Sequence, residues 1–365
     1  MKLSVVRPNP TAGGGGDLKA DGTIPLTANW DAGSYKITAQ QLESDVATGT
    51  APLVITSTTK VSNLNADLLD DQTGSYYLDS LNFTNIDPRT NDFRLTLTTA
   101  TPVTTSDVTG AVTIYCCPYI GNKIALYNGS SWVLHSSSEF SLGLGTLTSG
   151  RPYDVFCYSN SGTPTLEFTS WTNATTRTTG LAYQDGVLVK SGSTTRRYLG
   201  TFYTTATTTT EDSVTKRFLW NYYNRVVKPM RVLEGTDSWT YTTATIRQAR
   251  ATTTNRLDFV IGVSEDVVTA DVFVCSANST GSVPRTVGIG LDSTTTLASS
   301  CVVQSTAGIA SALTGCSAKY TDLPGIGFHY LAWLEWSTAT GTTTWYGDNG
   351  GSLVVQSGIL GNLLC

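Results

Sequence analysis

The chain has 365 residues, of which 40% are hydrophobic and only 14% are charged, and its net charge is −5. This length exceeds one small domain, and the lack of a basic tract argues against nucleic acid and anionic membranes as partners. No apolar run approaches the ~18 residues of a membrane span, and the segment around Lys2 and Arg7 lacks the apolar core of a signal peptide. Abundant Thr with few charges predicts an all-β protein.

Residues 1–60 are predicted to form an extended leader. Pro8, Pro10 and the consecutive glycines at 13–16 interrupt any regular element. Residues 1–16 either remain disordered or become ordered when they dock on a partner. Short apolar pieces such as Leu53–Ile55 suit strands that wind along an axis shared by several chains.

The stretch from Val61 to Tyr77 carries a narrow apolar stripe. Leu64, Leu68 and Leu69 follow the spacing i, i+4 and i+5, which places them on one side of a short helix or turn. Asn and Asp residues surround the stripe. Because so narrow a stripe cannot build a core alone, it needs copies of itself, as the seam of a coiled coil does.

The run Asn63-Leu64-Asn65-Ala66-Asp67-Leu68-Leu69-Asp70, followed by a Gly and two tyrosines, resembles an element of bacteriophage tail-fibre and related virion fibre proteins. In those proteins the element lies where three parallel chains wrap together, and its usual form has Gly where this chain has Asp71. The resemblance implies a homotrimer registered by residues 61–79. The implied trimer interface consists of Leu64, Leu68, Leu69, Tyr76 and Tyr77.

The leader adds to this resemblance. The segment Asn29-Trp30-Asp31-Ala32-Gly33 is similar to turns in phage fibre shafts. Membership of that family implies that residues 1–60 attach the protein to other virion proteins, and that the protein is assembled in the host cytoplasm and exposed on the particle surface.

Residues 80–230 show short strands separated by polar turns, roughly every 8–12 residues, which predicts an antiparallel sandwich or barrel. Asn128-Gly129, Ser161-Gly162 and Asp185-Gly186 each separate two strand-like runs and predict hairpins. Phe218, Trp220 and Tyr222 alternate, which favours a strand, although a spacing of four residues in the same stretch also allows a helix.

Four further motifs in this region resemble phage fibre and capsid-surface proteins. Their order within one sandwich-like region implies the fold and membership of a virion, but no reaction. The motifs are Gly150–Phe156, Gln184–Val189, Arg197–Thr201 and Trp220–Arg225.

Residues 231–365 are predicted to form a second, distal β-rich domain. Near-continuous apolar runs suggest strands that are buried on both faces. The predicted strands are Leu257–Val263, Asp271–Cys275, Thr286–Leu291, Gly327–Trp336 and Ser352–Val355.

Catalytic chemistry finds little support in the sequence. The chain has two histidines, His135 and His329, and both fit structural roles on strands better than a catalytic dyad. Glu335 and Asp348 flank an aromatic stretch and are the carboxylates to consider for glycan hydrolysis. No spacing of ligands indicates a metal site, and no cofactor is expected. We therefore expect a protein that is not an enzyme.

The seven cysteines are irregularly spaced, and their odd number argues against a disulfide framework. Buried, reduced thiols are expected. A disulfide between Cys301 and Cys316 after release from the host stays open.

An aromatic cluster near the C-terminal end is the candidate ligand site. Tyr330, Trp333, Trp336, Trp345 and Tyr346 lie on two predicted strands joined by the loop 338–342. Sugar rings stack on aromatic faces, but alternation puts residue 333 opposite to 330 and 336, so at least one ring belongs to the core. Core packing and a sugar platform both remain open. The candidate ligand-binding residues are Trp336, Trp345, Tyr346, Asp348 and Asn349.

The sequence thus predicts a trimeric phage fibre or appendage, with a leader and trimerisation segment followed by two β-sandwich-like domains. The N-terminus attaches to the virion, and the distal domain contacts a host-surface glycan or protein. One alternative is a protein that decorates the capsid or tail and binds no receptor. A second alternative is a glycan depolymerase carried on a fibre.

Overall fold

The computed structural model describes residues 86–365 throughout and, before them, only residues 34, 40, 44–48, 50–51, 68–69 and 72–78. Most of the predicted leader and Leu64 therefore lie outside the described residues. The chain divides into two compact units, Met1–Ala66 and Asp67–Cys365. All elements described below belong to the second unit.

A small hairpin and a short helix precede the main body. Strand β1 (Leu68–Leu69) pairs antiparallel with β2 (Gln72–Thr73), and helix α1 (Gly74–Leu78) follows directly. The described part of the predicted trimerisation segment thus begins with a short strand pair and ends with a five-residue helix. Leu68 and Leu69 lie in a strand and not in the short helix or turn that their spacing predicts.

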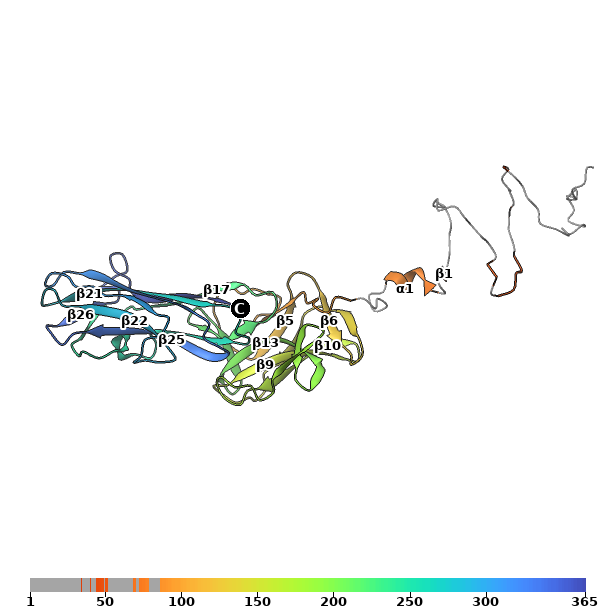
Figure 1. Ribbon diagram of the computed structural model, residues 1–365, viewed down its shortest axis with the longest axis horizontal. Coiled ribbons are helices and arrows are strands. Elements are labelled where there is room, and N and C mark those ends of the chain that lie inside the picture. Colours follow the sequence, from red (N-terminus) through yellow and green to blue (C-terminus); the bar gives the residue numbers. More distant parts are fainter. Residues whose placement is uncertain are drawn as a thin grey trace, which may run out of the picture. The chain divides into compact units, whose positions relative to one another are not determined.

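The body is all-β, which confirms the predicted fold class (Figure 1). Its first region contains β3 (Phe93–Thr96), β4 (Val108–Ala111), β5 (Thr113–Pro118), β6 (Lys123–Tyr127), β7 (Trp132–Ser136), β8 (Phe140–Gly143), β9 (Pro152–Asn160), β10 (Thr163–Ser170), β11 (Leu181–Gln184), β12 (Val187–Lys190), β13 (Ser193–Ala206), β14 (Thr209–Asp212), β15 (Lys216–Arg217) and β16 (Leu219–Asn221).

The second region contains one short 3₁₀ helix among its strands. Its elements are β17 (Val227–Leu233), β18 (Ser238–Tyr241), β19 (Arg247–Gln248), η2 (Ala249–Ala251), β20 (Arg256–Ile261), β21 (Val268–Asn278), β22 (Arg285–Leu291), β23 (Val302–Gln304), β24 (Thr314–Asp322), β25 (Gly327–Ser337), β26 (Thr343–Tyr346) and β27 (Gly358–Leu364).

The three hairpins predicted in the first region are confirmed. Strands β6 and β7, β9 and β10, and β11 and β12 pair antiparallel across the predicted turns. At the last turn Asp185 and Gly186 have φ of 50° and 81°. Two consecutive left-handed residues form the type of turn that matches the twist of a hairpin, which explains why Asp-Gly occurs there.

One thirteen-stranded sheet runs through both regions. The link is β15, whose Lys216 and Arg217 pair in parallel with Asp258 and Phe259 of β20. Strand β17 also continues through residue 230, where the boundary between two domains is predicted. The two regions therefore share backbone hydrogen bonds across the predicted domain boundary.

The second region is a sandwich of two sheets. Strands β19, β20, β22 and β25 of the long sheet face a seven-stranded sheet in the order β17-β27-β21-β24-β23, which also contains β18 and β26. Apolar side chains such as Phe259, Val272, Trp333 and Ile359 fill the space between these sheets. In the seven-stranded sheet, β17, β21 and β24 alternate between buried and more exposed positions. Strands β20, β22 and β25 of the long sheet are instead buried along most of their length, as their near-continuous apolar runs predict.

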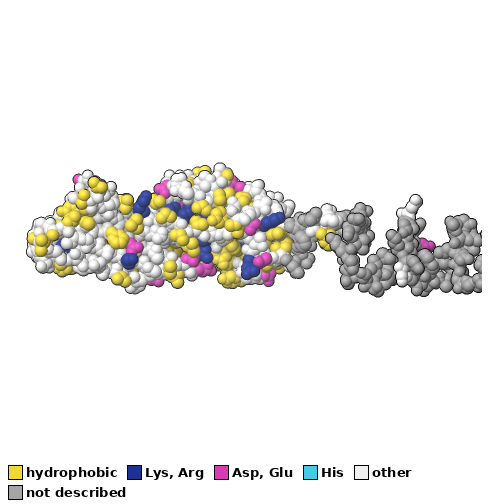
Figure 2. Space-filling view, turned by 90° about the horizontal axis from the view of Figure 1, so that it is seen from above, with side chains coloured by type: hydrophobic (Ala, Val, Ile, Leu, Met, Phe, Trp, Pro, Cys, Tyr) yellow, Lys and Arg dark blue, Asp and Glu magenta, His cyan; other side chains and the backbone are white. Residues whose placement is uncertain are grey.

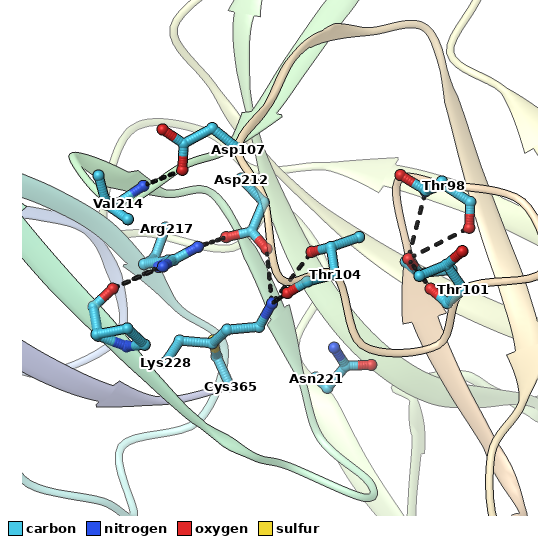
Figure 3. Close-up of polar contacts among 12 residues, drawn as sticks. Thr98, Thr101, Thr104, Asp107, Asp212, Val214, Arg217, Asn221, Lys228 and Cys365 are labelled. Carbon is cyan, nitrogen blue, oxygen red and sulfur yellow. Dashed lines mark hydrogen bonds and ion pairs between the residues drawn. The ribbon is translucent and has the colours of Figure 1, made fainter.

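A buried ionic network lies where the two regions meet (Figure 3). The Asp212 carboxylate accepts a hydrogen bond from Arg217 at 3.0 Å and from Lys228 Nζ at 3.4 Å. Lys228 also donates to the backbone oxygen of Thr104 at 2.7 Å. Asp212, Arg217 and Lys228 are all buried, so the network fixes β14, β15 and β17 to the loop that carries Thr104.

One predicted strand is wrong. Residues 352–354 of the predicted strand Ser352–Val355 form a turn, and Leu353 and Val354 are 98% and 81% exposed. The last strand is instead β27, which includes Gly358 and Gly361 and pairs on both sides with β17 and β21. Its glycines weaken the local strand signal, and the strand forms because two neighbours enclose it.

Charged side chains are unevenly distributed over the body. Figure 2 shows Lys, Arg, Asp and Glu mainly over the middle and the first region, whereas the far end formed by the second region is largely apolar or uncharged on that face. Among the described residues, no helix has the length and apolar character needed to cross a membrane.

Candidate binding site

The predicted aromatic platform is divided between two sheets. Strand β25, with Trp336, belongs to the thirteen-stranded sheet, whereas β26, with Trp345 and Tyr346, pairs with β18 and β21 of the opposite sheet. Trp345 is 0% exposed and Trp333 is also fully buried, so both indoles belong to the core. Trp336 and Tyr346 are half-buried. The structure does not bring the five aromatic rings onto one surface.

Asp348 and Asn349 lie in the turn that follows β26. The N–H groups of Gly347 and Asn349 both donate to the backbone oxygen of Asp237, which holds the turn against the strand pair β18–β26. Asn349 is exposed and has a φ of 51°, a conformation that Asn tolerates better than most residues. The backbone conformation of the turn therefore explains why Asn occurs at position 349.

Trp336 lines a small apolar cavity of about 190 Å³. Gly288 forms part of its wall, and a Cβ at that position would lie 2.0 Å from Leu297 Cδ2. Ile246, Val287 and Leu334 add to the mainly apolar lining, to which Thr286 and Glu335 also belong. This cavity lacks the convergent polar groups that orient a polar ligand.

Glu335, which the sequence offers as a hydrolytic carboxylate, is occupied within the core. Its side chain is fully buried, and its oxygens accept hydrogen bonds from Trp239 Nε1 at 2.8 Å and from Arg247 Nε at 2.7 Å. Burial raises the pKa of the Glu335 carboxyl above its usual value, while the Trp239 and Arg247 contacts oppose that shift. The Glu335 carboxylate thus connects β25 to β18 and β19, the strands of Trp239 and Arg247. It does not share a cavity with Asp348.

Both histidines have structural partners. His135 Nδ1 lies 3.0 Å from the backbone oxygen of Gly162, and burial lowers its pKa. His329 is buried and its Nδ1 lies 2.7 Å from Asp292 Oδ2. In the part of the chain that the structure describes, no group of three or more His, Cys, Asp or Glu side chains is arranged to hold a metal ion.

All seven cysteine thiols are free in the structure. Cys301 Sγ accepts the N–H of Ile289 at 3.3 Å, whereas Cys316 Sγ lies 3.5 Å from Ser276 Oγ. The two residues considered for a disulfide therefore have separate polar partners.

The predicted trimer interface is only partly described. Leu64 lies outside the described residues, and Leu68 and Leu69 are described as backbone of β1. Tyr76 and Tyr77 lie in α1, are 37% and 38% exposed, and contact each other edge to face at a ring distance of 5.4 Å.

A polar pocket that sequence reasoning missed lies on the long sheet where the two regions meet. It encloses about 390 Å³, within the size range of small-ligand sites. Strands β15 and β20 position its charged side chains through their parallel pairing, and the loop before β20 adds two hydroxyl groups. The polar pocket is lined by Thr215, Lys216, Thr253, Thr254, Arg256 and Asp258.

Charges in the polar pocket are arranged in pairs. Arg256 Nε lies 2.8 Å from Asp258 Oδ1, and the Arg256 guanidinium stacks over Tyr330 at 4.6 Å from the ring centre. Lys216 Nζ lies 3.1 Å from Glu211 Oε2. Burial raises the pKa of Asp258, and the positive charge of Arg256 opposes this shift.

The polar pocket therefore combines one nearly buried carboxylate with partly exposed cations and hydroxyls. The side chains of Lys216 and Arg256 are 41% and 28% exposed, whereas that of Asp258 is 9% exposed. Such a set both donates and accepts hydrogen bonds, as a ligand rich in hydroxyl groups requires. No local motif marks this site, because the pocket depends on the pairing of β15 with β20 across some forty residues of sequence.

Comparisons with known proteins give little guidance. Neither a protein-family model nor a curated protein matches the chain. Among solved structures, the insecticidal delta-endotoxin Cry8Ea1 from Bacillus thuringiensis is similar at 8% identity and a TM-score of 0.23, over 75% of this chain and 51% of that chain. The mosquito-larvicidal toxin Cry4Aa from the same organism is similar at 10% identity and a TM-score of 0.19, over 81% of this chain and 55% of that chain. The chain spans about half the length of these toxins, and so low a TM-score carries no argument about function.

Proposed function

We propose that this chain is a structural virion protein, a homotrimeric bacteriophage fibre or head or tail appendage. Residues 1–60 attach it to other virion proteins, residues 61–79 register the three chains, and the β-rich body projects outward and contacts the host surface. The observation that carries this proposal is the run Asn63–Asp70, with its narrow leucine stripe and its resemblance to virion fibre proteins. An all-β body on the C-terminal side of this run agrees with the proposal.

Within this proposal, the polar pocket is the part of the body that contacts a host-surface glycan. A sugar presents many hydroxyl groups in fixed directions, and the pocket offers carboxylate, guanidinium, ammonium and hydroxyl groups around one space. Hydrogen bonds to charged groups are the stronger ones, so Arg256 and Asp258 dominate the expected binding. The buried Trp345 offers no ring face to a ligand, and the pocket therefore replaces the aromatic platform as the favoured site.

The test compares two arginines with matched surroundings. Arg256 and Arg196 each pair with a carboxylate at 2.8 Å, stack over a tyrosine ring and are 28% and 27% exposed, but only Arg256 lines the pocket. In the full-length protein, Arg256→Gln should weaken binding to cells that the virion adsorbs to by about tenfold, whereas Arg196→Gln should leave it unchanged. Equal binding by both folded variants would remove the pocket from the proposal.

The alternative without receptor binding gives a different result in the same experiment. A protein that only decorates the capsid or tail should not bind those cells even as wild type, although it is still found in purified particles. Detection of the chain in purified virions by mass spectrometry tests the proposal shared by both alternatives. A chain that is expressed in infected cells but missing from the particles would contradict it.

A further inference from the structure

The seven-stranded sheet presents an outer face whose residues follow from the register. Arg231 of β17 pairs with Leu360 of β27, which pairs with Asp271 of β21, and Asp271 pairs with Lys319 of β24. These side chains are exposed or half-exposed, whereas their sequence neighbours Met230, Val272 and Ile359 are buried. We call this row, with the next row Leu233, Gly358 and Phe273, the outer sheet face.

Large apolar side chains gather at the centre of the outer sheet face. Leu360, Leu233 and Phe273 are 40%, 47% and 49% exposed. They are cross-strand neighbours on β27, β17 and β21, so they form one cluster and are not scattered. The solvent side of an antiparallel sheet usually carries polar residues, and an apolar cluster rimmed by charges marks an interaction surface.

A hollow adjoins this cluster. It encloses about 280 Å³ and is lined by Pro229, Arg231, Asp271, Leu360 and Asn362, among others. No described residue forms an ion pair or a side-chain hydrogen bond with Arg231. The partner of Asp271 is Lys319 at 3.3 Å, whose side chain is 71% exposed, and such a surface pair contributes little stability. Both Arg231 and Asp271 are therefore available to a second molecule.

We propose that a second copy of this chain packs face to face on the outer sheet face, around a two-fold axis that runs along β27. A rotation of 180° about that axis leaves each cross-strand row at the same position along β27. It brings the β17 side of one copy against the β21 side of the other. It puts Leu360 against the partner's Leu360, and Arg231 against the partner's Asp271. In the next row it puts Leu233 against the partner's Phe273. The face is thus complementary to itself in charge and in apolar character.

Gly358 and Asn362 are also compatible with this two-fold rotation. Gly358 lies between Leu233 and Phe273 in its row and has no side chain, so the two apolar residues on either side have room to meet those of the partner. Asn362 faces the partner's Asn362, and two amides satisfy each other because each has donors and an acceptor. Face-to-face packing at small angles is the usual arrangement of two twisted sheets.

This two-fold symmetry indicates that the molecule bound to the outer sheet face is a second copy of the chain. A surface of uniform charge repels its own copy, whereas one that carries a cation and an anion on opposite sides of an axis attracts it. An unrelated partner would need a matching arrangement, but a second copy supplies it without further assumption. This inference does not rest on the proposed trimer, because a two-fold contact joins copies in pairs whether or not three chains also associate through residues 61–79.

Charge reversal tests the inference in the full-length protein. Arg231→Asp and Asp271→Arg each place like charges against the partner, and each should raise the concentration at which the pair dissociates by at least about tenfold. The double variant Arg231→Asp/Asp271→Arg restores opposite charges across the axis and should recover the wild-type value within about threefold. A matched control is Lys123→Asp, which changes a charge away from the outer sheet face and should have no effect.

Masses from analytical ultracentrifugation over a range of concentrations give the readout. The inference predicts an even number of chains, two or six, and the proposed trimer predicts a multiple of three. A particle of one or three chains at all concentrations would overturn the inference, as would a double variant that dissociates as readily as the single ones. A particle of two chains would uphold the two-fold contact and contradict the trimer, so the two proposals fail separately.

Discussion

The indole of Trp345 is enclosed between the two sheets of the second region, with 0% of its surface exposed. Removing a buried tryptophan leaves a cavity that the neighbouring side chains fill only in part. We expect Trp345→Ala to lower the free energy of unfolding by about 3–5 kcal/mol, measured by urea denaturation. Trp336→Ala, at a half-buried position, is the control and should lose clearly less. Equal losses would contradict the placement of these two residues.

Glu335 gives a pH dependence with a defined sign. Burial raises its pKa in the folded state above the ordinary 4.5, so the stabilising contribution of the protonated carboxyl is complete below that value and is lost as the pH rises through the folded pKa. Glu335→Gln keeps a neutral side chain of the same shape. We therefore expect the variant to gain stability relative to wild type over the pH range that begins near the ordinary value of 4.5 and extends above it. Urea midpoints of both proteins across this range measure it, and a difference that does not change with pH would contradict it.

At the scale of single residues, the sequence predicts which residues share one side of a strand, but it does not predict what that side packs against. Strand alternation separates residue 333 from 330 and 336, and Trp333 is indeed buried while Tyr330 and Trp336 are half-buried. Alternation does not tell which face meets the core or which sheet a strand joins. The sequence therefore predicts Trp345 as a ligand-binding residue, whereas its strand pairs in the opposite sheet and its ring is buried.

Elements joined by short turns are the part of the fold that the sequence predicts well. The hairpins at Asn128-Gly129, Ser161-Gly162 and Asp185-Gly186 form because the turn residues accept left-handed backbone conformations. Pairings between distant segments leave no local signal. The parallel contact of β15 with β20, which builds the polar pocket, and the enclosure of β27 between β17 and β21 belong to this second kind.

The ionic network at the meeting point of β14, β15 and β17 gives a prediction for these elements. Asp212→Asn leaves Arg217 and Lys228 buried without their anion, which should cost about 3–5 kcal/mol of unfolding free energy. Glu167→Gln is the matched control, because Glu167 also binds two cations, Lys190 and Arg196, but is 26% exposed. Its loss should stay below about 1 kcal/mol. Comparable urea midpoints for both variants would contradict a network that holds the elements together.

At the scale of the whole molecule, the described body should unfold as one unit. The thirteen-stranded sheet crosses from the first region into the second, and one core cluster includes Phe156 and Trp220 of the first region with Phe259 and Trp333 of the second. Unfolding either region alone would expose this shared core to water. Differential scanning calorimetry should therefore show one transition for residues 86–365. Two separate transitions would instead support two domains divided near residue 230.

The proposed function depends on the number of chains that associate through residues 61–79. The stripe of Leu64, Leu68 and Leu69 is too narrow for a single chain, and its resemblance to virion fibre proteins implies three parallel copies. Light scattering of the full-length protein tests this claim most directly. The account predicts a mass that is a multiple of three times 38.9 kDa. A mass of one or two chains at every concentration would contradict the trimer and, with it, the proposed fibre.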